Sequence, residues 1–456
     1  MKRFTLAVCI AALCIASDAS AQDRTLVLQG GTLIDGTGRA PITDAVVVVE
    51  NGRIFSVGRR GQMTIPAGAQ IIDTTGQTIL PGLVDMHLHL RGWKIPFYPL
   101  YGVVTTGDIH NDTQWILGQK ALLKSGFMKG PRLFVSGARI NGPNGGPLKD
   151  STGKIVEDPS NVKTPDEARA YVRYLHAAGV DFLKVDYSVT EDQLKAIIDE
   201  ASKYNLPVLG HINNVDTAMN YGGKEIEHMA GIFRAQMIRE GKTPPASNGA
   251  ALAAGVDPKK FGPLIQRMVE QNVALDIALY WTVKPLVWDI MRPEVARLAN
   301  DPATAFVPAE EKKLWLQDPA KPNPVEDAAT ITFLNQFAAA GGHFTIDTDG
   351  NEKSDVPPGL GTHIIMEGVA KLGMPKMKII QAITLWPAQA MGIDRDYGSV
   401  EPGKHGDFVI VQGDPLADIK AARNIKMVIM GGKVMDTKLD PNFVNPLPRP
   451  ASAMDP

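Results

Sequence analysis

Eight short apolar runs, separated by amphipathic segments, constrain the fold of this chain more than any other feature of its sequence. The runs lie at residues 79–89, 102–106, 132–136, 180–185, 206–211, 224–228, 273–277 and 343–347. Strands that alternate with helices favour a parallel sheet, and eight such repeats favour a closed barrel. The sequence therefore predicts an α/β fold with a (β/α)8 TIM barrel at its centre.

Two of the amphipathic segments begin with helix-start signals. Thr190 is followed three residues later by Gln193, ahead of apolar residues at helical spacing, which is the pattern of a capping box. Thr164 and Pro165 begin a second such segment. We therefore expect a helix after each of these threonines.

The two ends of the chain have a different pattern. Residues 22–80 contain short β-rich runs broken by glycines, and Asn51-Gly52 between two of them indicates a β-hairpin. Residues 393–440 are β-like again. We expect the two segments to form one small β-sandwich domain beside a barrel of residues 81–392, followed by a proline-rich tail at 441–456 that is extended or disordered.

The first 21 residues have the features of a secretory signal peptide. Lys2 and Arg3 are followed by an apolar run, and Ala19-Ser20-Ala21 has the A-x-A form of a cleavage site. The apolar run is shorter than a membrane-spanning helix requires, so secretion is favoured over a short membrane anchor. We expect a secreted, periplasmic protein.

The cysteines and the charge balance limit the chemistry. Cys9 and Cys14 both lie within the predicted signal peptide, so the mature chain would hold neither disulfides nor thiolate metal ligands. The 47 basic and 49 acidic residues give a formal net charge of −2, which gives no reason to expect nucleic acid or a membrane surface as a partner. We expect a small-molecule substrate, and the sequence leaves a homo-oligomer open.

The first apolar run ends in His87-Leu88-His89. Residues two apart on a strand point to the same face, so the two imidazoles are directed at one point. Imidazole is the commonest protein ligand of zinc-like metals. Taken alone, the pair fits a metal half-site and two ordinary histidines equally well.

Further polar side chains lie at or near the carboxyl ends of later runs. With the first pair, the set consists of His87, His89, Lys184, His211, His228 and Asp349. The strand ends of a closed barrel meet on one face, so these six side chains can converge there. Four imidazoles, one carboxylate and one lysine suit two divalent metal ions bound through nitrogen and oxygen.

Lys184 is the unusual member of this set, because a buried ammonium is costly and would repel the metals. A lowered pKa would remove its charge, and carboxylation by CO2 would convert it to a carbamate anion that could bridge two metals. The alternative is an unmodified lysine paired with Asp181, Asp186 or Glu227.

The ordered set of motifs resembles the amidohydrolase superfamily, in particular its imidazolonepropionase-like and prolidase-like branch. The resemblance is carried by residues 80–89, 179–185, 210–211, 226–228, 347–350, 382–388 and 398–410. These motifs span nearly the whole mature chain, and each is weak alone but the ordered set is specific. The resemblance implies a metal-dependent hydrolase.

The resemblance also implies a role for each member of the set. One metal would be bound by His87, His89 and Asp349, and the other by His211 and His228. N6-carboxylated Lys184 would bridge the two divalent ions, which we expect to be zinc, together with a hydroxide that attacks the scissile carbonyl.

Asp349 would act as the catalytic residue, taking the proton of the nucleophile and passing it to the leaving nitrogen. Asp347 is its rival, two residues earlier on the same face. Asp349 is preferred because it follows Thr348 in the T-D pattern of the family.

The expected activity is hydrolysis of an amide-type C–N bond in a dipeptide, an N-acyl amino acid or a cyclic amide. A lactonase or esterase on the same metal site and a catalytically inactive metal-binding barrel are the alternatives. Pro147 stands where prolidase-like relatives often carry a substrate-binding histidine, and Thr106-Gly107-Asp108 replaces their Val-Arg-Asp. These departures leave the metal site unaffected but concern the substrate specificity, so a dipeptidase-like specificity stays one of several open alternatives.

Two long connections, residues 231–263 and 281–324, follow the sixth and seventh runs. Connections of this length are commonly functional or carry their own helices, and in a barrel they lie over the catalytic mouth. Surface elaboration or an oligomer contact fits equally well.

Four further residues are candidates for orienting a substrate, each with an ordinary structural role as the alternative. They are Arg91, Tyr187, Arg234 and Tyr280. The histidines not expected to be ligands are His110, His176, His343, His363 and His405.

Overall fold

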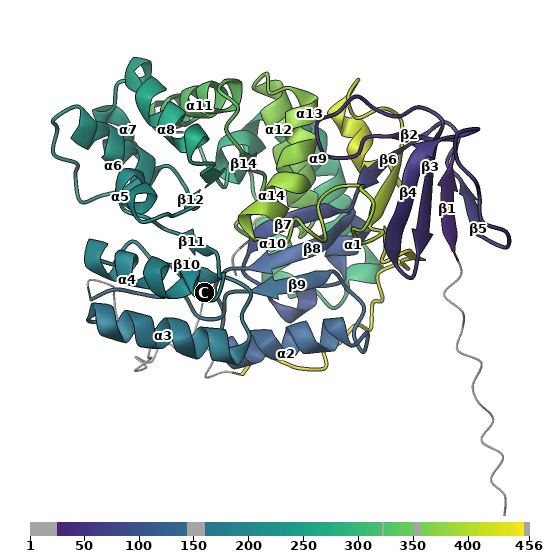
Figure 1. The fold of residues 1–456 in the computed structure, drawn as a ribbon, viewed down its shortest axis with the longest axis horizontal. Helices are drawn as coiled ribbons and strands as arrows, with labels where there is room; N and C mark the ends of the chain where they lie inside the picture. Colours follow the sequence, from purple (N-terminus) through teal and green to yellow (C-terminus); the bar gives the residue numbers. More distant parts are fainter. Residues whose placement is uncertain (1–24, 144–159, 322, 351–355, 451–456) are drawn as a thin grey trace, which may run out of the picture.

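The computed structural model describes residues 25–143, 160–321, 323–350 and 356–450. The predicted signal peptide lies outside these residues. The described chain is an α/β protein in which sheets built from the two chain ends lie beside a larger part of alternating strands and helices (Figure 1).

Each of the eight apolar runs coincides with one strand of a series whose pairings are all parallel, and the first run also includes the last three residues of β6 (Gln77–Pro81). The strands are β7 (Leu83–Leu88), β8 (Val103–Asp108), β9 (Arg132–Val135), β10 (Leu183–Val185), β11 (Val208–Gly210), β12 (Glu225–Glu227), β13 (Ala274–Asp276) and β14 (Phe344–Thr345). They pair within three groups, β7-β8-β9, β10-β11 and β12-β13-β14. The expected alternation is confirmed, although β10 to β14 are only two or three residues long.

Single backbone hydrogen bonds connect some of these groups. The amide of Asp181, just before β10, donates to Val135 O in β9 at 2.9 Å. The amide of His89, just after β7, donates to Gly350 O at 3.3 Å, beyond β14. The last strand of the series therefore lies beside the first.

Helices follow most of these strands. They are α1 (Phe97–Leu100), α2 (Thr113–Lys124), α3 (Pro165–Ala178), α4 (Glu191–Ser202), α5 (Val215–Asn220), α6 (Ala230–Arg239), α7 (Ala250–Gly255), α8 (Gly262–Glu270), α9 (Tyr280–Asn300), α10 (Ala309–Trp315), α11 (Pro324–Ala339), α12 (Leu360–Lys371), α13 (Lys376–Ala382) and α14 (Leu385–Ala390). Short 3-10 helices lie at Gly92–Lys94, Pro258–Lys260, Pro302–Thr304 and Ile419–Arg423. The first long connection thus carries α6 to α8, and the second carries α9 and α10. This agrees with the expectation that connections of this length contain helices of their own.

The helix-start signals are confirmed. The Thr190 side chain accepts from the amide of Gln193 while the Gln193 side chain accepts from the amide of Thr190, so α4 begins with a complete capping box. The Thr164 side chain accepts from the amide of Glu167 at the start of α3. Both threonines satisfy donors that the first helical turn would otherwise leave unpaired.

The chain ends form two further sheets. One has the order β4-β3-β1-β5, with β1 (Leu26–Gln29), β3 (Ala45–Glu50), β4 (Arg53–Arg59) and β5 (Gln70–Asp73). The other has the order β17-β16-β15-β6-β2, with β2 (Thr32–Leu33), β6 (Gln77–Pro81), β15 (Phe408–Gln412), β16 (Ile425–Met430) and β17 (Lys433–Val434). The expected sheet made from both ends is therefore present, joined where β6 pairs antiparallel with β15.

The turn at Asn51-Gly52 is the predicted hairpin between β3 and β4. Both residues have positive φ, at 51° and 76°, as a type I′ turn requires. One apolar core, which includes Val47 and Ile79, contains residues of both sheets. The two sheets therefore pack face to face.

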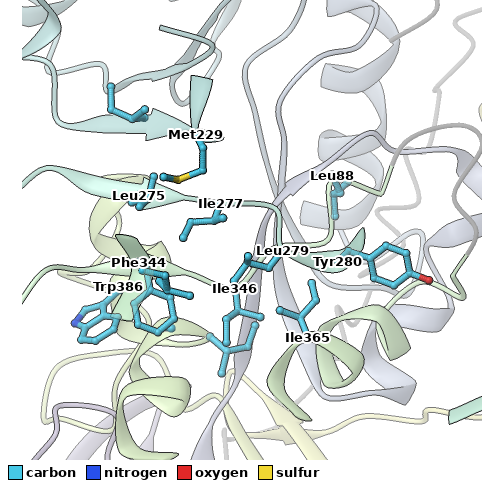
Figure 2. Packing of buried hydrophobic residues seen from close by; sticks show 14 of the residues in the cluster. Leu88, Met229, Leu275, Ile277, Leu279, Tyr280, Phe344, Ile346, Ile365 and Trp386 are labelled. Atoms are coloured by element: carbon cyan, nitrogen blue, oxygen red, sulfur yellow. The ribbon is translucent and has the colours of Figure 1, made fainter. Parts of the chain in front are cut away.

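A separate and larger apolar core lies between the parallel strands and their helices. Figure 2 shows part of it, where Phe344 and Ile346 lie near Trp386 and Ile365 from the following helices. This core fixes the positions of the strand ends, which carry the site described below.

The described part of the predicted tail, residues 441–450, contains neither helix nor strand but is packed against α2. The Trp115 Nε1–H donates to Leu447 O at 3.0 Å, and the side chains of Gln119 and Asn445 donate to each other at 3.1 and 2.9 Å. The described part of this segment therefore lacks regular secondary structure and lies on the surface of the helix.

Candidate metal centre

Three side chains from two neighbouring strand ends form a compact group. His87 lies in β7, His89 directly follows that strand, and Asp349 follows β14. One ligand atom from each residue lies within 4.8 Å of the others. Asp349 Oδ1 is 3.1 Å from His87 Nε2 and 3.5 Å from His89 Nε2. The fold thus brings Asp349 to the two histidines, although it lies more than two hundred residues away in the sequence.

The orientation of His87 is set by Asp276 at the end of β13. The Nδ1 atom of His87 makes a short hydrogen bond with Asp276 Oδ2, which leaves Nε2 directed at Asp349. Burial favours the neutral imidazole, but the carboxylates of Asp276 and Asp349 outweigh it and raise the pKa of His87 to about 10. A carboxylate that orients a histidine in this way is a common support for metal-binding histidines.

His89 and Asp349 have opposite electrostatic surroundings. Burial lowers the pKa of His89 to about 4, against the opposing effect of Asp349, and its Nδ1 lies 3.2 Å from His110 O. Burial opposes the charge of Asp349, yet His87 and His89 hold the pKa of this carboxyl well below its usual range. At neutral pH, Asp349 is therefore ionised and His89 is neutral.

His228 lies on the other side of Asp349, at the end of β12. Its Nε2 is 3.9 Å from Asp349 Oδ2, and its ring centroid is 5.6 Å from that of His87. His87, Glu227 and His228 form a second group in which one ligand atom from each residue lies within 4.8 Å of the others. The second group thus adjoins the first and includes Glu227, which the sequence had suggested only as a lysine partner.

His211 lies beside His228 but belongs to neither group. The two ring centroids are 5.1 Å apart, and His211 Nε2 is 3.5 Å from Glu227 Oε2. Its Nδ1 is 3.5 Å from Asp186 Oδ2. His211 therefore lies next to the second group, between Glu227 and His228 of that group and Asp186.

Lys184, in the middle of β10, is 1% exposed and its Nζ forms an ion pair with Glu227 Oε2. Burial lowers the pKa of Lys184 to about 7, against the opposing effect of Asp349. Of the three partners expected for an unmodified lysine, Asp181 instead pairs with Lys120 at 2.7 Å, and Asp186 lies beside His211. All six predicted residues are therefore brought to one end of the strands.

Two further buried carboxyls lie close to this end. Glu225 Oε2 accepts from the amide of Gly210 at 2.9 Å, and burial raises the pKa of Glu225 to about 8. Asp347 Oδ1 accepts from the amide of Met86 at 2.7 Å, and burial together with Asp276 raises the pKa of Asp347 well above its usual range. The surroundings of Asp349 thus on balance favour the ionised carboxylate, whereas those of its rival Asp347 oppose it.

Sequence reasoning missed Asp276 and Glu225. Both lie within apolar runs, where an acidic residue is expensive to bury without a partner. That cost was the available signal, but the sequence does not say which neighbouring strand provides the partner.

The donor atoms present here suit a divalent metal ion. They are imidazole nitrogens and carboxylate oxygens, as zinc-like ions accept. Metal binding requires ionised carboxylates and neutral imidazoles. Asp349 and His89 have these forms near pH 7, whereas the pKa of His87 is raised to about 10, so that a bound ion would have to displace its proton. In the part of the chain that the structure describes, the buried Oε1 of Glu227 has no hydrogen-bond partner. The residues therefore fit a bound cation.

A cavity of about 610 Å³ opens beside His211 and His228. Its walls are mostly apolar and include Met229, Phe233 and Ile277. The size and apolar lining are typical of a site for a small molecule. A second cavity of about 230 Å³ lies on the far side of His211, between the loops that follow β10 and β11.

The other candidate residues are distributed as follows. The rings of Tyr187 and His211 are stacked with centroids 4.6 Å apart, and the Arg234 guanidinium lies 5.8 Å from the Tyr187 ring centre. Arg91 and Tyr280 are buried. The nearest of the other histidines is His110, 6.3 Å from His89 between ring centroids, and the others contact aromatic residues as pairs His176–Tyr204, His343–Trp386, His363–Tyr101 and His405–Tyr397. Pro147 lies outside the described residues.

Among the helices that the structure describes, none combines the length and the apolar character needed to cross a membrane.

The family model that matches this chain is that of the amidohydrolase family, over residues 78–435. The match includes all eight parallel strands and both groups of ionisable residues.

Two curated relatives match the chain over stretches of very different length. The chain is 33% identical over 118 residues to a 5-methylthioadenosine/S-adenosylhomocysteine deaminase of Symbiobacterium thermophilum, which is 22% of this chain and 27% of that protein. It is 23% identical over 437 residues to an adenine deaminase of Rubrobacter xylanophilus, which is 91% of this chain and 59% of that protein. The chain thus spans less than two thirds of the length of these relatives.

Solved structures share the fold over nearly their whole length. Phenylurea hydrolase B has a TM-score of 0.67 at 20% identity, covering 93% of this chain and 100% of its own. A Xaa-Pro dipeptidase with bound methionine has a TM-score of 0.62 at 19% identity, covering 90% of this chain and 100% of its own. At these identities the likeness concerns the fold alone.

Proposed function

This chain belongs to the amidohydrolase family, and from this we propose that it is a metal-dependent hydrolase that cleaves an amide-type C–N bond in a dipeptide, an N-acyl amino acid or a cyclic amide. The observation that carries the proposal is the grouping of His87, His89 and Asp349, whose ligand atoms lie within 4.8 Å of one another at the carboxyl ends of β7 and β14. The adjoining apolar cavity provides space for a small substrate.

In this proposal the eight parallel strands form one closed (β/α)8 barrel. The backbone hydrogen bonds from β9 to the start of β10, and from the end of β7 to Gly350, support this arrangement. In a closed barrel all the candidate ligands lie at the carboxyl-terminal face, where barrel enzymes bind their substrates.

Two divalent ions, with zinc as the expected metal, would be held by the residues of the two groups. His87, His89 and Asp349 would hold one ion, and His211 and His228 the other, with Lys184 between them in its N6-carboxylated form. Bound there, the ions would lower the pKa of a water molecule and polarise the carbonyl group of the substrate. Carboxylation would replace the ion pair between Lys184 and Glu227.

The side chains of this chain contribute orientation and proton transfer. Asp276 fixes the ring of His87, so that Nε2 faces Asp349. The ionised carboxylate of Asp349 can accept the proton of the attacking water and deliver it to the leaving nitrogen. The apolar residues of the cavity exclude bulk water from the reacting bond, which strengthens these charge interactions.

The location and the partners follow from the sequence alone. We propose cleavage after Ala21, export to the periplasm and a soluble substrate of low molecular weight. Amino-terminal sequencing of the exported protein should give Gln22 as the first residue, and Met1 would contradict export by this signal.

Metal analysis tests the centre directly. The purified protein should contain about two divalent ions per chain, and His87→Ala together with His89→Ala should remove about one of them. Carbon-13 NMR of the folded, metal-loaded protein prepared in 13C-bicarbonate should show a carbamate carbon that Lys184→Ala lacks. A metal-free wild-type protein that is fully active would contradict the proposal.

A substrate screen tests the reaction. Dipeptides, N-acyl amino acids, cyclic amides, lactones and aminopurines are incubated with the metal-loaded protein and with Asp349→Asn. The proposal is supported if the wild type hydrolyses an amide and Asp349→Asn does not. Selective cleavage of lactones would assign the lactonase alternative, release of ammonia from purines would assign a deaminase, and no turnover in any class would favour an inactive metal-binding barrel.

A further inference from the structure

Arg234, on α6, is a partly buried cation without an acidic partner in the part of the chain that the structure describes. Its Nη2 donates to Asn248 Oδ1 at 2.6 Å and to Ala246 O at 3.3 Å, and both acceptors are neutral. Its Nη1 is buried and has no hydrogen-bond partner among the described residues. A guanidinium remains charged at any ordinary pH, so one of its donors is oriented toward a missing acceptor.

Other arginines nearby do not share this property. Arg239, on the same helix, and Arg267 are both paired with Asp216 at 2.5 Å. Arg139 lies 3.6 Å from Asp186. Because burying an unpaired charge is costly, the isolated state of Arg234 suggests that its counter-charge comes from a ligand.

A column of stacked groups connects Arg234 to the candidate metal centre. The guanidinium lies 5.8 Å from the ring centre of Tyr187. Tyr187 in turn stacks on His211, with ring centroids 4.6 Å apart and planes inclined by 8°. Stacking on the aromatic face holds the guanidinium in one orientation. Arg234 is therefore placed two stacking contacts away from a predicted metal ligand.

The large cavity lies alongside this column. Its walls include Tyr187 and His211, the predicted ligand His228, and Asn248, which accepts from Arg234. A molecule in the cavity can thus contact both the centre and the surroundings of the guanidinium. The apolar residues of the wall, among them Met229, Phe233 and Ile277, suit a hydrocarbon group of such a molecule.

The acidic residues of the cavity wall do not neutralise Arg234. Asp327 accepts from the hydroxyl of Thr282 at 2.8 Å, and the amide of Asn323 is near Glu326 at 3.5 Å. No carboxylate among the described residues lies within ion-pairing distance of Arg234. Arg234 thus contacts two residues of the cavity wall, Tyr187 and Asn248, while the acidic residues Glu326 and Asp327 belong to another part of that wall.

We propose that Arg234 binds a carboxylate of the substrate, and that the natural substrate is an amide with a free carboxylate and an apolar acyl group. This inference rests on the proposed function and narrows it to N-acyl amino acids and peptides with a free carboxyl terminus, as opposed to cyclic amides and neutral amides. Arginine suits this role because its planar donors match both oxygens of a carboxylate.

The test compares matched substrates on matched variants. An N-acyl amino acid and its carboxamide analogue, which lacks the negative charge, are hydrolysed by the wild type, Arg234→Met, Arg234→Lys and the control Arg239→Met. We expect Arg234→Met to raise KM for the acid by roughly 10- to 100-fold, with kcat and the KM of the carboxamide nearly unchanged. Arg234→Lys should give an intermediate KM, and Arg239→Met should leave both substrates unaffected.

Other outcomes would overturn the assignment. Equal effects of Arg234→Met on the acid and the carboxamide would give Arg234 a structural role only, and no effect on either would remove it from the site. Binding is also measured calorimetrically, with an N-acyl amino acid added to the metal-free protein. If no amide is hydrolysed by the wild type, the proposed function fails. Weaker acid binding by Arg234→Met than by the wild type would still support the carboxylate site, and equal binding would refute it.

Discussion

Asp349 adopts a backbone conformation that is rare for a residue with a side chain, with φ at 44°. His228, after β12, and Ala278, after β13, also have positive φ, at 57° and 50°. Such conformations are costly for residues other than glycine and are concentrated at functional sites. Three adjacent strands thus end in sharp turns at the same place, and two of these turns position residues of the candidate centre.

Replacement of Asp349 by asparagine tests the charge of this residue without changing its size. Because the wild-type carboxyl is ionised near pH 7, we expect Asp349→Asn to lower kcat by about 10²- to 10⁴-fold. Burial raises the pKa of Asp347, which favours its uncharged form, so Asp347→Asn is a matched control that should retain most of the activity. Steady-state kinetics of both variants on the best amide of the screen, with circular dichroism to verify folding, provide the comparison.

His363 predicts a pH dependence of stability away from the candidate centre. This buried residue lies on α12, and its Nε2–H donates to Tyr101 O at 2.9 Å. Burial lowers its pKa from 6.5 to about 4. Between these pH values the unfolded chain binds a proton that the folded chain does not, so stability is full above pH 6.5 and declines as the pH falls toward 4.

We expect this decline to reach about 1.4 kcal/mol per pH unit from His363 alone. His363→Gln keeps an N–H donor but cannot titrate, so its free energy of unfolding should change less steeply over the same pH range. Urea denaturation at several pH values measures both slopes. Parallel curves for the two proteins would show that His363 is charged in the folded state or plays no part.

At the residue scale, the sequence predicted which side chains meet but not how they are paired. The positions of His87, His89 and Asp349 followed from strand alternation and from the convergence of strand ends. The sequence offered Glu227 as one of three partners for Lys184 but did not indicate Asp276 as the partner of His87, because both pairings depend on how far neighbouring strands are shifted along one another. A local pattern does not contain that information.

At the scale of single elements, α4 shows where local sequence suffices. Its capping box at Thr190 and Gln193 was readable from the sequence because every interaction lies within four residues. Thr190→Ala should lower the free energy of unfolding by about 1 kcal/mol. Thr190→Ser, which keeps the oxygen acceptor, should cost much less, and urea denaturation of the two variants distinguishes them. Equal losses for both would indicate that the methyl group of Thr190, and not the cap, is responsible.

The helices of the long connections could not be predicted in the same way. Their arrangement depends on aromatic contacts between distant segments. The ring centroid of Phe261 lies 6.2 Å from that of Phe233 in α6 and 5.1 Å from that of Phe333 in α11. These contacts place α6 and α11 around the cavity. The sequence indicated that the connections were long enough to be functional, while their packing is a tertiary property.

At the scale of the whole molecule, the segment 441–450 attaches the end of the chain to α2. Removing residues 441–456 deletes the acceptor of Trp115 and the partner of Gln119. We expect a loss of about 2–4 kcal/mol in the free energy of unfolding, since each such bond contributes about 1 kcal/mol. Removing only residues 451–456 should have little effect. Thermal melts measured by tryptophan fluorescence compare the two truncations, and equal melting temperatures would show that the contacts to α2 contribute nothing.

The pairing of β6 with β15 also has a consequence for the order of folding. Thr78 in β6 donates to Gly413 O, just beyond β15, across a sequence separation of 335 residues. During synthesis, the edge of β6 that receives β15 stays unpaired until nearly all of the chain has left the ribosome, and unpaired strand edges promote association between chains. The sheet is therefore completed only once β15 has been synthesised, and nascent chains that end before residue 408 should be prone to associate and should need a chaperone.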